Sequence, residues 1–370
     1  MSIYNLITIE TGVGFCPAPM ENNDMFKAED VKKLMEKVND YRITEHPSSG
    51  DCSWERGAYM LGCLAAYDAI GRKDYHEYAL KWADDNNWAF YDDGSDWAYK
   101  NADYKICGQS YLRLMEIDPT CGTMENMINS MERILNDPEN DYWWWVDTIY
   151  MALPYYNMMG VKLSDSRYFD KAHALFENSK EERGCYDHEE KLWYRDERFL
   201  PDKARTASGK KVFWGRGNGW VIAGLARTLA VLPETNRYYD EYRSIFCDMA
   251  KALLPWQQED GFWRTSIIDP EEFDTPETSG TALMLYAYML GINLGILDES
   301  WFEAVRKGFD GLNRIAVFEN GKIGYVQVVA WGPGPVDRDA SNDYAVGTYL
   351  LLCHEIIKHI EKEQQAGAAG

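Results

Sequence analysis

The sequence has few basic residues for its length. Its 370 residues include 38 lysines and arginines against 60 aspartates and glutamates, which gives a formal net charge of −22 at pH 7. Nucleic acids and anionic membranes bind basic surfaces, so we expect neither as a partner. An anionic ligand would be repelled by this charge and would need a few local arginines or lysines. That requirement suits a short oligosaccharide better than a long polyanion.

Export signals and membrane-spanning segments are also missing. The first residues, MSIYNLITIE, have neither a basic start nor a continuous apolar stretch, so no signal peptide is visible. The longest apolar run begins at Ala282, is interrupted by Asn293 and two tyrosines, and is too short to cross a bilayer. We expect a cytoplasmic protein, with a periplasmic location left open if a leader was removed.

Motifs for metals, cofactors and disulfides are absent. The eight cysteines are scattered without a C-x-x-C pair, which favours free thiols. His354 and His359 are five residues apart and therefore on different faces of a helix, so HEIIKH is not a zinc motif. A dinucleotide-binding loop would need glycine where Trp220 or Ile222 stands. We therefore expect no metal and no cofactor.

Helical periodicity dominates the chain. Apolar residues make up 46% and aromatic residues 14%, so a large core is available. The spacing of apolar residues predicts twelve helices, at residues 28–40, 54–70, 73–87, 103–116, 122–135, 142–159, 166–180, 218–232, 235–254, 277–295, 299–315 and 342–362. Every second helix is apolar all round, and the others have one apolar stripe and one charged face. The first kind is typical of buried helices and the second of surface helices.

This alternation predicts an all-α fold, an (α/α)6 barrel of six helical hairpins with short β-hairpin loops at one rim. We expect one catalytic domain over 1–370, with extended or frayed ends at 1–25 and 363–370, as a monomer or a homodimer. Three long connections, at 185–213, 256–274 and 316–342, break the helical pattern and are the expected rim loops.

Asp147 is the first candidate catalytic residue. In DYWWWVDTIYMALP it is expected inside a helix, with Trp144 three residues before it and Tyr150 three after. A carboxylate on such a face is costly unless it is satisfied or useful. Burial beside indole rings would raise its pKa, as a general acid working near neutral pH requires. The alternative is a structural aspartate bonded to a helix end or to a tyrosine.

Asp103, in ADYKICGQSYLRL, stands at the start of another inner helix. Aspartate is common at that position as a helix cap, which is the alternative to a catalytic role. Because Asp147 is expected on a neighbouring inner helix, we interpret Asp103 as the second carboxylate of a site.

The stretch FWGRGNGW is the third candidate. Its glycines allow positive φ and close backbone approach, and Asn218 is a plausible helix cap. Trp214 and Trp220 have flat faces on which sugars stack, and Arg216 can bind a carboxylate with two parallel bonds. A tight turn with packed tryptophans and an ion-paired arginine is the alternative. Further substrate-binding candidates are His188, Trp144 and Trp54.

Four segments together resemble glycoside hydrolase family 105, the unsaturated rhamnogalacturonyl hydrolases. They are FWGRGNGW, WWVDTIYMALP, ADYKICGQSYLRL and ETSGTALMLYAYMLGI, and they span residues of about 100 to 295. Family 88, the unsaturated glucuronyl hydrolases, shares the fold, but the W-G-R-G-N-G-W form favours family 105. The segment VVAWGPGPVDRDASND departs from the family pattern, which leaves the sugar next to the uronate open.

The resemblance implies an (α/α)6 barrel that hydrates a vinyl ether. Its substrates are oligosaccharides from polysaccharide lyases, which end in a 4,5-unsaturated uronic acid. The resemblance makes Asp147 the proton donor to C4 and the base for the water that adds to C5, with Asp103 positioning the acid or the water. Arg216 and His188 would contact the uronate or its neighbour, with Trp214 and Trp220 as stacking walls.

Two other functions stay open at this point. An inverting glycosidase could use the same two aspartates on saturated glycosides. A carbohydrate-binding protein could have the same fold with a degenerate site.

Overall fold

A computed structural model describes residues 26–369 of the chain; the expected extended segment 1–25 lies outside them. Six helical positions form an inner ring, in which each helix packs on the next and the last packs on the first. The inner helices are α2 (Trp54–Ile70), α5 (Ile106–Ile117), α7 (Thr148–Met151) continued by α8 (Leu153–Leu163), α10 (Gly215–Val231), α12 (Thr278–Asn293) and α14 (Asp343–Ala369). The expected (α/α)6 barrel is therefore confirmed.

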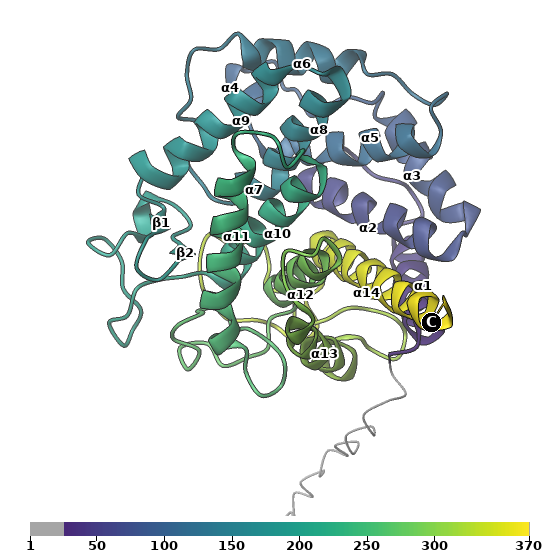
Figure 1. Ribbon diagram of the computed structural model, residues 1–370, viewed down its shortest axis with the longest axis vertical. Helices are drawn as coiled ribbons and strands as arrows, with labels where there is room; N and C mark the ends of the chain where they lie inside the picture. Colours follow the sequence, from purple (N-terminus) through teal and green to yellow (C-terminus); the bar gives the residue numbers. More distant parts are fainter. Residues whose placement is uncertain (1–25, 370) are drawn as a thin grey trace, which may run out of the picture.

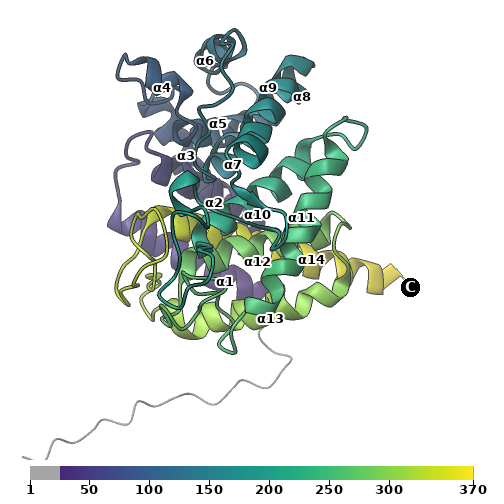
Figure 2. The same cartoon turned by 90° about the vertical axis from the view of Figure 1, so that its left-hand side faces the viewer.

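Six outer helices cover this ring, and five of them have extensive contacts with an inner helix (Figures 1 and 2). They are α1 (Ala28–Glu45), α3 (Lys73–Asp85), α6 (Glu125–Leu135), α9 (Ser166–Glu177), α11 (Tyr239–Leu253) and α13 (Phe302–Gly311). The burial pattern explains the division. Every residue of α12 from Thr278 to Ile292 is buried, whereas α6 buries only Met127, Met131 and Ile134.

The ring closes through a close contact between α2 and α14. A Cβ atom on Gly62 would lie 2.2 Å from the carbonyl oxygen of Gly347, and one on Gly347 would lie 2.3 Å from that of Ala58. Only glycine permits this distance between helix backbones. Asp343, at the start of α14, also pairs with Arg42 of α1.

Shorter elements and loops gather at the end of the barrel where most inner helices begin. They include α4 (Asp96–Lys100), the 3-10 turns η1 (Asp103–Lys105), η3 (Glu197–Phe199) and η4 (Leu254–Trp256), the π-helical turns η2 (Asn178–Glu182) and η6 (Leu312–Ala316), and the antiparallel strands β1 (Tyr186–Asp187) and β2 (Leu192–Trp193). The 3-10 turn η5 (Glu299–Trp301) follows α12 at the other end, where Glu299 pairs with His359. The three long connections meet at the start of α10: Trp214 bridges Ser266, Asn218 bonds Trp193, and Arg216 bonds Gln327.

Several helix boundaries differ from the prediction, and three of these differences lie in the inner helices around the site and the ring closure. The inner helix predicted from residue 142 begins only at Thr148, the start of α7. The backbone before it bonds elsewhere: Ser179 Oγ donates to the carbonyl of Trp143, and the amide of Val146 donates to the carbonyl of Arg195. These bonds replace helical ones. Helix α10 starts at Gly215, three residues early, and α14 continues to Ala369 through residues expected to be frayed, since EKEQQ is rich in helix-forming residues.

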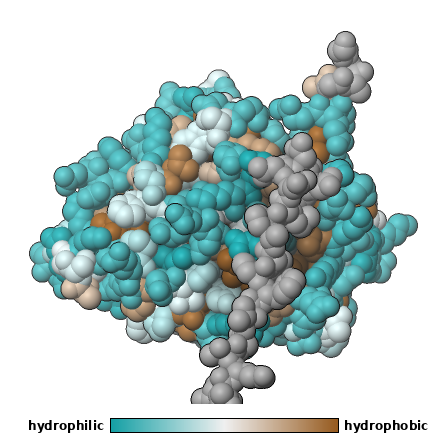
Figure 3. Space-filling model, turned by 90° about the horizontal axis from the view of Figure 1, so that it is seen from below, coloured by the Kyte–Doolittle hydropathy of each residue, from teal (hydrophilic) through white to brown (hydrophobic). Residues whose placement is uncertain are grey.

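The surface is mostly hydrophilic. Figure 3 shows one face on which teal side chains predominate and brown patches are small and separate. No helix in the described part of the chain is long and apolar enough to cross a membrane. The seven cysteines within residues 26–369 are all free thiols, and Cys16 lies outside the described residues.

Candidate active site

A pocket opens at the end of the barrel where most inner helices begin, and we call it the carboxylate pocket. It encloses about 80 Å³. Its lining comes from six separate segments: Trp54, Asp103, Trp145, Asp147, Met151, Arg195, Trp214, Arg216, Val329, Ala330 and Trp331. Five of the nine residues expected to form a site are therefore brought together: both aspartates, Trp54, Trp214 and Arg216.

Asp147 lies at the N-cap position of α7 and makes no capping hydrogen bond. Its side chain is 14% exposed, and its Oδ2 is buried without a hydrogen-bond partner among the described residues. Neither of the two structural roles considered for it, bonding to a helix end or to a tyrosine, accounts for this oxygen. Burial raises the pKa of Asp147, and the charges of Arg195 and Arg216 oppose that rise without cancelling it.

Asp103 opens the turn η1, but its side chain does not cap a helix. Its Oδ1 instead accepts a hydrogen bond of 3.1 Å from Trp145 Nε1. Burial raises the pKa of Asp103 to about 7, and the charge of Asp147 adds to this shift. Two carboxyl groups in one pocket with raised pKa values can hold a proton near neutral pH.

Arg195 was not among the expected site residues. Its Nε lies 3.5 Å from Asp147 Oδ2, too far for a good hydrogen bond, and its Nη1 donates to Asp196 Oδ2 at 2.6 Å. Its guanidinium also lies 5.3 Å from the ring centroid of Trp144. The loop after β2 carries Arg195 back to the pocket, and nothing in its local sequence, YRDER, indicates that return.

The start of α10 is built by close packing. A Cβ atom on Gly215 would lie 2.6 Å from the carbonyl oxygen of Arg264, and one on Gly217 would lie 2.8 Å from the ring of Trp214. Neither glycine has positive φ, so close approach is the only part of the glycine prediction that holds. This packing brings Trp214 and Arg216 to the pocket wall.

Arg216 is held without an acidic partner. Its Nη1 donates to the carbonyl of Gln327 at 2.7 Å and its Nη2 to that of Val328 at 3.0 Å, and no carboxylate in residues 26–369 lies within 4 Å. The expected alternative, an ion-paired arginine, is therefore wrong. The guanidinium stacks 4.6 Å from the Trp214 ring and 5.0 Å from Tyr344. Its positive charge thus stays available at the pocket.

Glu277, the N-cap of α12, fixes the loop that follows Tyr325. Its Oε1 accepts from the amide of Gln327 at 3.1 Å, and Tyr344 Oη donates to the carbonyl of Gln327 at 2.6 Å. The side chain of Gln327 in turn accepts from Trp214 Nε1 at 2.7 Å. The next residues are left at the pocket mouth with exposed apolar side chains, 65% for Val328 and 64% for Trp331.

The other expected residues lie away from the pocket lining. Trp220 is fully buried behind Trp54, with ring centroids 6.4 Å apart, so it is not a stacking wall. Asn218 lies inside the first turn of α10 and joins it to the backbone of Trp193, so it is not the cap. His188 is 62% exposed, bonds Glu181 and does not line the pocket, so its predicted contact with the substrate stays a prediction.

Trp144 lies beside the pocket and not in its lining. It is 37% exposed and packs on Trp145, with ring centroids 4.7 Å apart. Its contact with Arg195 places it next to Asp147, where it can shape the approach to the acid.

One cluster in the described chain has the residue types of a metal site: His173, Glu177 and Glu241. It lies on the outer helices α9 and α11, outside the carboxylate pocket. Lys180 Nζ contacts both glutamates. An ammonium group therefore already balances the charge of these carboxylates.

The chain is similar to several known proteins. The model of Glycosyl Hydrolase Family 88 matches residues 28–360. An unsaturated 3S-rhamnoglycuronyl hydrolase of Formosa agariphila is 29% identical over 325 residues, 82% of this chain and 84% of that protein. A family 88 glycosyl hydrolase structure from Bacteroides vulgatus is 32% identical over 90% of this chain and 99% of its own, with a TM-score of 0.84. A structure described as a polysaccharide lyase is 34% identical over 90% and 98%, with a TM-score of 0.85.

Proposed function

The chain belongs to Glycosyl Hydrolase Family 88, and on that premise we propose that its carboxylate pocket removes a 4,5-unsaturated uronic acid from the non-reducing end of lyase-generated oligosaccharides. The chain is a glycoside hydrolase, and the curated proteins similar to it are unsaturated uronyl hydrolases. A pocket of about 80 Å³ suits one end group of a sugar chain better than a long internal segment.

The observation that carries this proposal is the pair Asp103 and Asp147 in a pocket with two arginines. A vinyl ether needs one acid that stays protonated near neutral pH, and burial supplies it here. The substrate carboxylate needs local positive charge on a protein of net charge −22, and Arg216 and Arg195 supply that. We assign the uronate to these two arginines, with Arg195 in place of His188.

The proposed reaction proceeds through hydration. Asp147 donates its proton to C4 of the unsaturated sugar, and the positive charge that develops at C5 is next to the ring oxygen. Water adds to C5, and the carboxylate of Asp147 takes the proton that the water loses. The hemiketal at C5 then opens, which leaves a hemiacetal at C1 that releases the next sugar. Asp103 orients the acid or the water, and Trp214 and Trp54 form the walls for the sugar ring.

Hydration can be tested with a lyase-generated unsaturated disaccharide. We expect loss of the ultraviolet absorbance of the conjugated enoate and, in D2O, one deuterium at C4 of the released uronate by mass spectrometry and NMR. Hydration loses the absorbance before or together with sugar release. A direct glycosidase would instead release the next sugar before the absorbance falls, because the double bond is lost, and C4 deuterated, only when the freed enol later tautomerises. That outcome, or activity on saturated glycosides alone, would support the inverting mechanism and reject hydration.

The relative described as a lyase suggests a second reaction to test. A lyase acting on intact polymer creates the enoate, so absorbance rises, whereas the proposed reaction consumes it. A carbohydrate-binding protein would change absorbance in neither assay. The two substrates therefore separate the three functions.

Within the family, the W-G-R-G-N-G-W segment supports a finer placement among the family 105 type of unsaturated rhamnogalacturonyl hydrolases. A panel of lyase products from rhamnogalacturonan, ulvan and arabinogalactan tests this placement and identifies the parent polymer. The cytoplasmic location and the monomeric or homodimeric state stay predictions. Cell fractionation and light scattering test them.

A further inference from the structure

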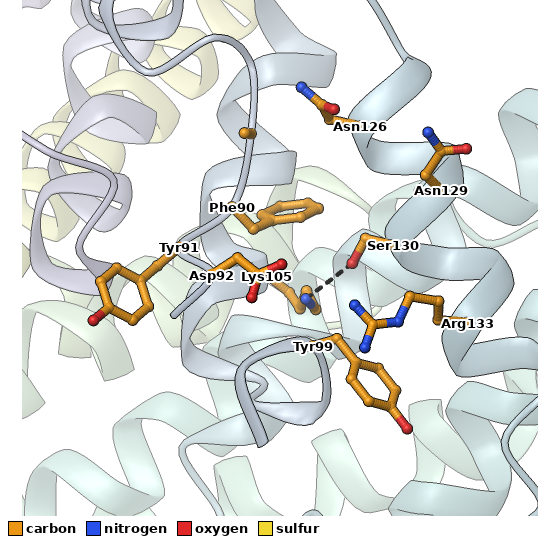
Figure 4. Close-up of a pocket in the computed structure, with 10 residues that line it drawn as sticks. Phe90, Tyr91, Asp92, Tyr99, Lys105, Asn126, Asn129, Ser130 and Arg133 are labelled. Atoms are coloured by element: carbon orange, nitrogen blue, oxygen red, sulfur yellow. Dashed lines mark hydrogen bonds between the residues drawn. The ribbon is translucent and has the colours of Figure 1, made fainter. Parts of the chain in front are cut away.

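A second pocket, which we call the lysine pocket, shares no lining residue with the carboxylate pocket. It encloses about 200 Å³ between η1, α6 and the loop after α3. The turn η1 contributes to both: Asp103 at its start lines the carboxylate pocket, and Lys105 at its end lines the lysine pocket. Figure 4 shows Lys105, Ser130 and Arg133 converging in it.

Lys105 is buried with too few acceptors. Its side chain is 1% exposed, and an ammonium group has three N–H donors. Ser130 Oγ accepts one at 3.1 Å, and the ring of Phe90 lies 4.6 Å from Nζ. No carboxylate in the described part of the chain lies within 4 Å of this nitrogen. A buried ammonium left in this state is costly.

The other two buried lysines of residues 26–369 are satisfied. Lys171 Nζ donates to three oxygens at 2.6 to 2.8 Å, and Lys180 Nζ pairs with Glu177 and Glu241. Lys105 therefore differs from the buried lysines of the same protein. The difference indicates that its remaining acceptors come from outside the chain.

A second cation faces the same space. Arg133 of α6 stacks on Tyr99 at 4.1 Å and has no carboxylate within 4 Å among the described residues. Asn129 and Ser130, on the same face of α6, add neutral polar groups. The lining includes one acid, Asp92, whose Oδ1 accepts from the amide of Gly94 at 2.8 Å.

We propose that the lysine pocket binds a small oxyanion, a sulfate or a carboxylate group, between Lys105 Nζ and the guanidinium of Arg133. Oxyanions provide the acceptors that both cations lack, and charge-assisted hydrogen bonds are the strong ones. The oxyanion is either a free ion or an acidic substituent on the sugar chain. The second source rests on the proposed function, but binding of the anion itself does not.

The titration of Lys105 gives this site a pH dependence. Burial lowers the pKa of Lys105 to about 7; the charge of Asp92 and the thiol of Cys107 oppose that shift, and Arg133 adds to it. An anion binds the ammonium form and not the amine. Affinity is therefore highest below pH 7 and falls as the pH rises above it.

Inorganic sulfate is the probe for the first experiment. We expect sulfate to raise the melting temperature of the protein above its value in chloride at equal ionic strength, more at pH 6 than at pH 8. Because Arg133 is exposed on α6, Arg133→Gln should fold normally and weaken sulfate binding about tenfold in calorimetry. Arg243→Gln, which removes an exposed arginine from α11, is the matched control and should change nothing.

Lys105→Met provides the second variant, and it should abolish the response to sulfate. The same sulfate response in the wild type, Arg133→Gln and Lys105→Met, or no response beyond that to chloride, would overturn the proposal. Circular dichroism confirms that each variant is folded before titration.

The source of the anion follows from kinetics on two substrates. If the group belongs to the sugar chain, Arg133→Gln raises KM for longer sulfated or carboxylated lyase products and leaves the disaccharide unchanged, and inorganic sulfate competes with the longer products. If it is a free ion, KM is unchanged for both. A protein inactive on every lyase product that still binds sulfate would reject the proposed function and leave this site standing.

Discussion

Asp103 and Lys105 are two residues apart on one turn, face different pockets, and titrate near the same pH from opposite directions. The pKa of Asp103 is raised to about 7 and that of Lys105 is lowered to about 7, and burial is the first cause of both shifts. Burial penalises charge of either sign. The same physical effect therefore keeps a proton on the acid and takes one from the base.

The surroundings of the two groups differ. The carboxylate pocket contains two acids and two arginines, so a bound anion meets positive charge next to a proton donor. The lysine pocket contains two cations and one acid that bonds elsewhere, so it offers positive charge without an acid poised to react. The first arrangement suits chemistry on an anionic sugar, and the second suits binding alone.

The largest effect is expected from Asp147→Asn. An amide cannot donate the proton to C4, so kcat should fall by about 10³-fold or more, since general acid catalysis contributes roughly 10²–10⁴-fold. Substrate binding, measured by calorimetry, should persist because the arginines and tryptophans are unchanged. Asp141→Asn, an exposed aspartate in the same segment, is the control and should keep full activity. Equal activity of the two variants would remove Asp147 from the mechanism.

Asp103→Asn should have the next largest effect, a loss of about 100-fold in kcat. In the wild type the pair keeps a proton up to about pH 7, so kcat declines as the pH rises above that value. Asp103→Asn removes the carboxyl group whose pKa is raised to about 7, so the decline in kcat moves to lower pH. A pH–rate profile checks this shift. An unchanged profile would show that the two acids titrate independently.

Asp103 and Lys105 should affect the free energy of unfolding of the wild-type protein in opposite ways as the pH rises. Folded Asp103 holds a proton that the unfolded chain releases between about pH 4 and 7, so its contribution to the free energy of unfolding falls over that range. Folded Lys105 lacks a proton that the unfolded chain binds between about pH 7 and 10, so its contribution rises there.

In Asp103→Asn the fall in the free energy of unfolding should be absent, and in Lys105→Met the rise should be absent. Each change should amount to about 2 kcal/mol. One pKa unit corresponds to about 1.4 kcal/mol, and we expect less than the full pKa shift to appear as stability. Urea unfolding across pH 4 to 10, expressed as the difference between variant and wild type, isolates the two slopes. If this difference in the free energy of unfolding changed with pH in the same direction for both variants, burial would not shift the two pKa values in opposite directions.

The smallest effect concerns an exposed aromatic residue at each pocket. Trp331→Ala removes an apolar face from the mouth of the carboxylate pocket and should raise KM about fivefold, with kcat retained, since stacking of this kind is worth about 1 kcal/mol. Tyr91→Ala removes a comparable exposed ring, 45% accessible, from the lysine pocket and should leave KM for a disaccharide unchanged. Steady-state kinetics on both variants would show whether the two rims differ.

The sequence predicts the barrel well because burial leaves a clear pattern. A helix such as α12, apolar on all sides, has to lie inside a ring, and charged faces have to lie outside. Asp147 could be singled out for the same reason, since a carboxylate among tryptophans is costly unless it has a use, and Asp103 followed only as its expected neighbour.

The parts that could not be predicted depend on contacts between distant segments. Arg195 comes close to Asp147 because a long loop returns to the pocket. Ser179 and Arg195 bond the backbone before Thr148, which keeps that stretch from being helical. Trp220 has the composition of a sugar-binding wall but faces Trp54 and not the pocket. Which face of a tryptophan is open depends on neighbours that local sequence does not reveal.

The glycine contact between α2 and α14 has a consequence for biosynthesis. Every other inner helix precedes α14 in the chain, so the ring stays open until residues 343–369 leave the ribosome. Until then the Gly62 face of α2 and the free side of α12 expose apolar surface, the state in which nascent chains aggregate or recruit chaperones. The order of the helices along the chain thus makes α14 the element on which completion of this barrel waits.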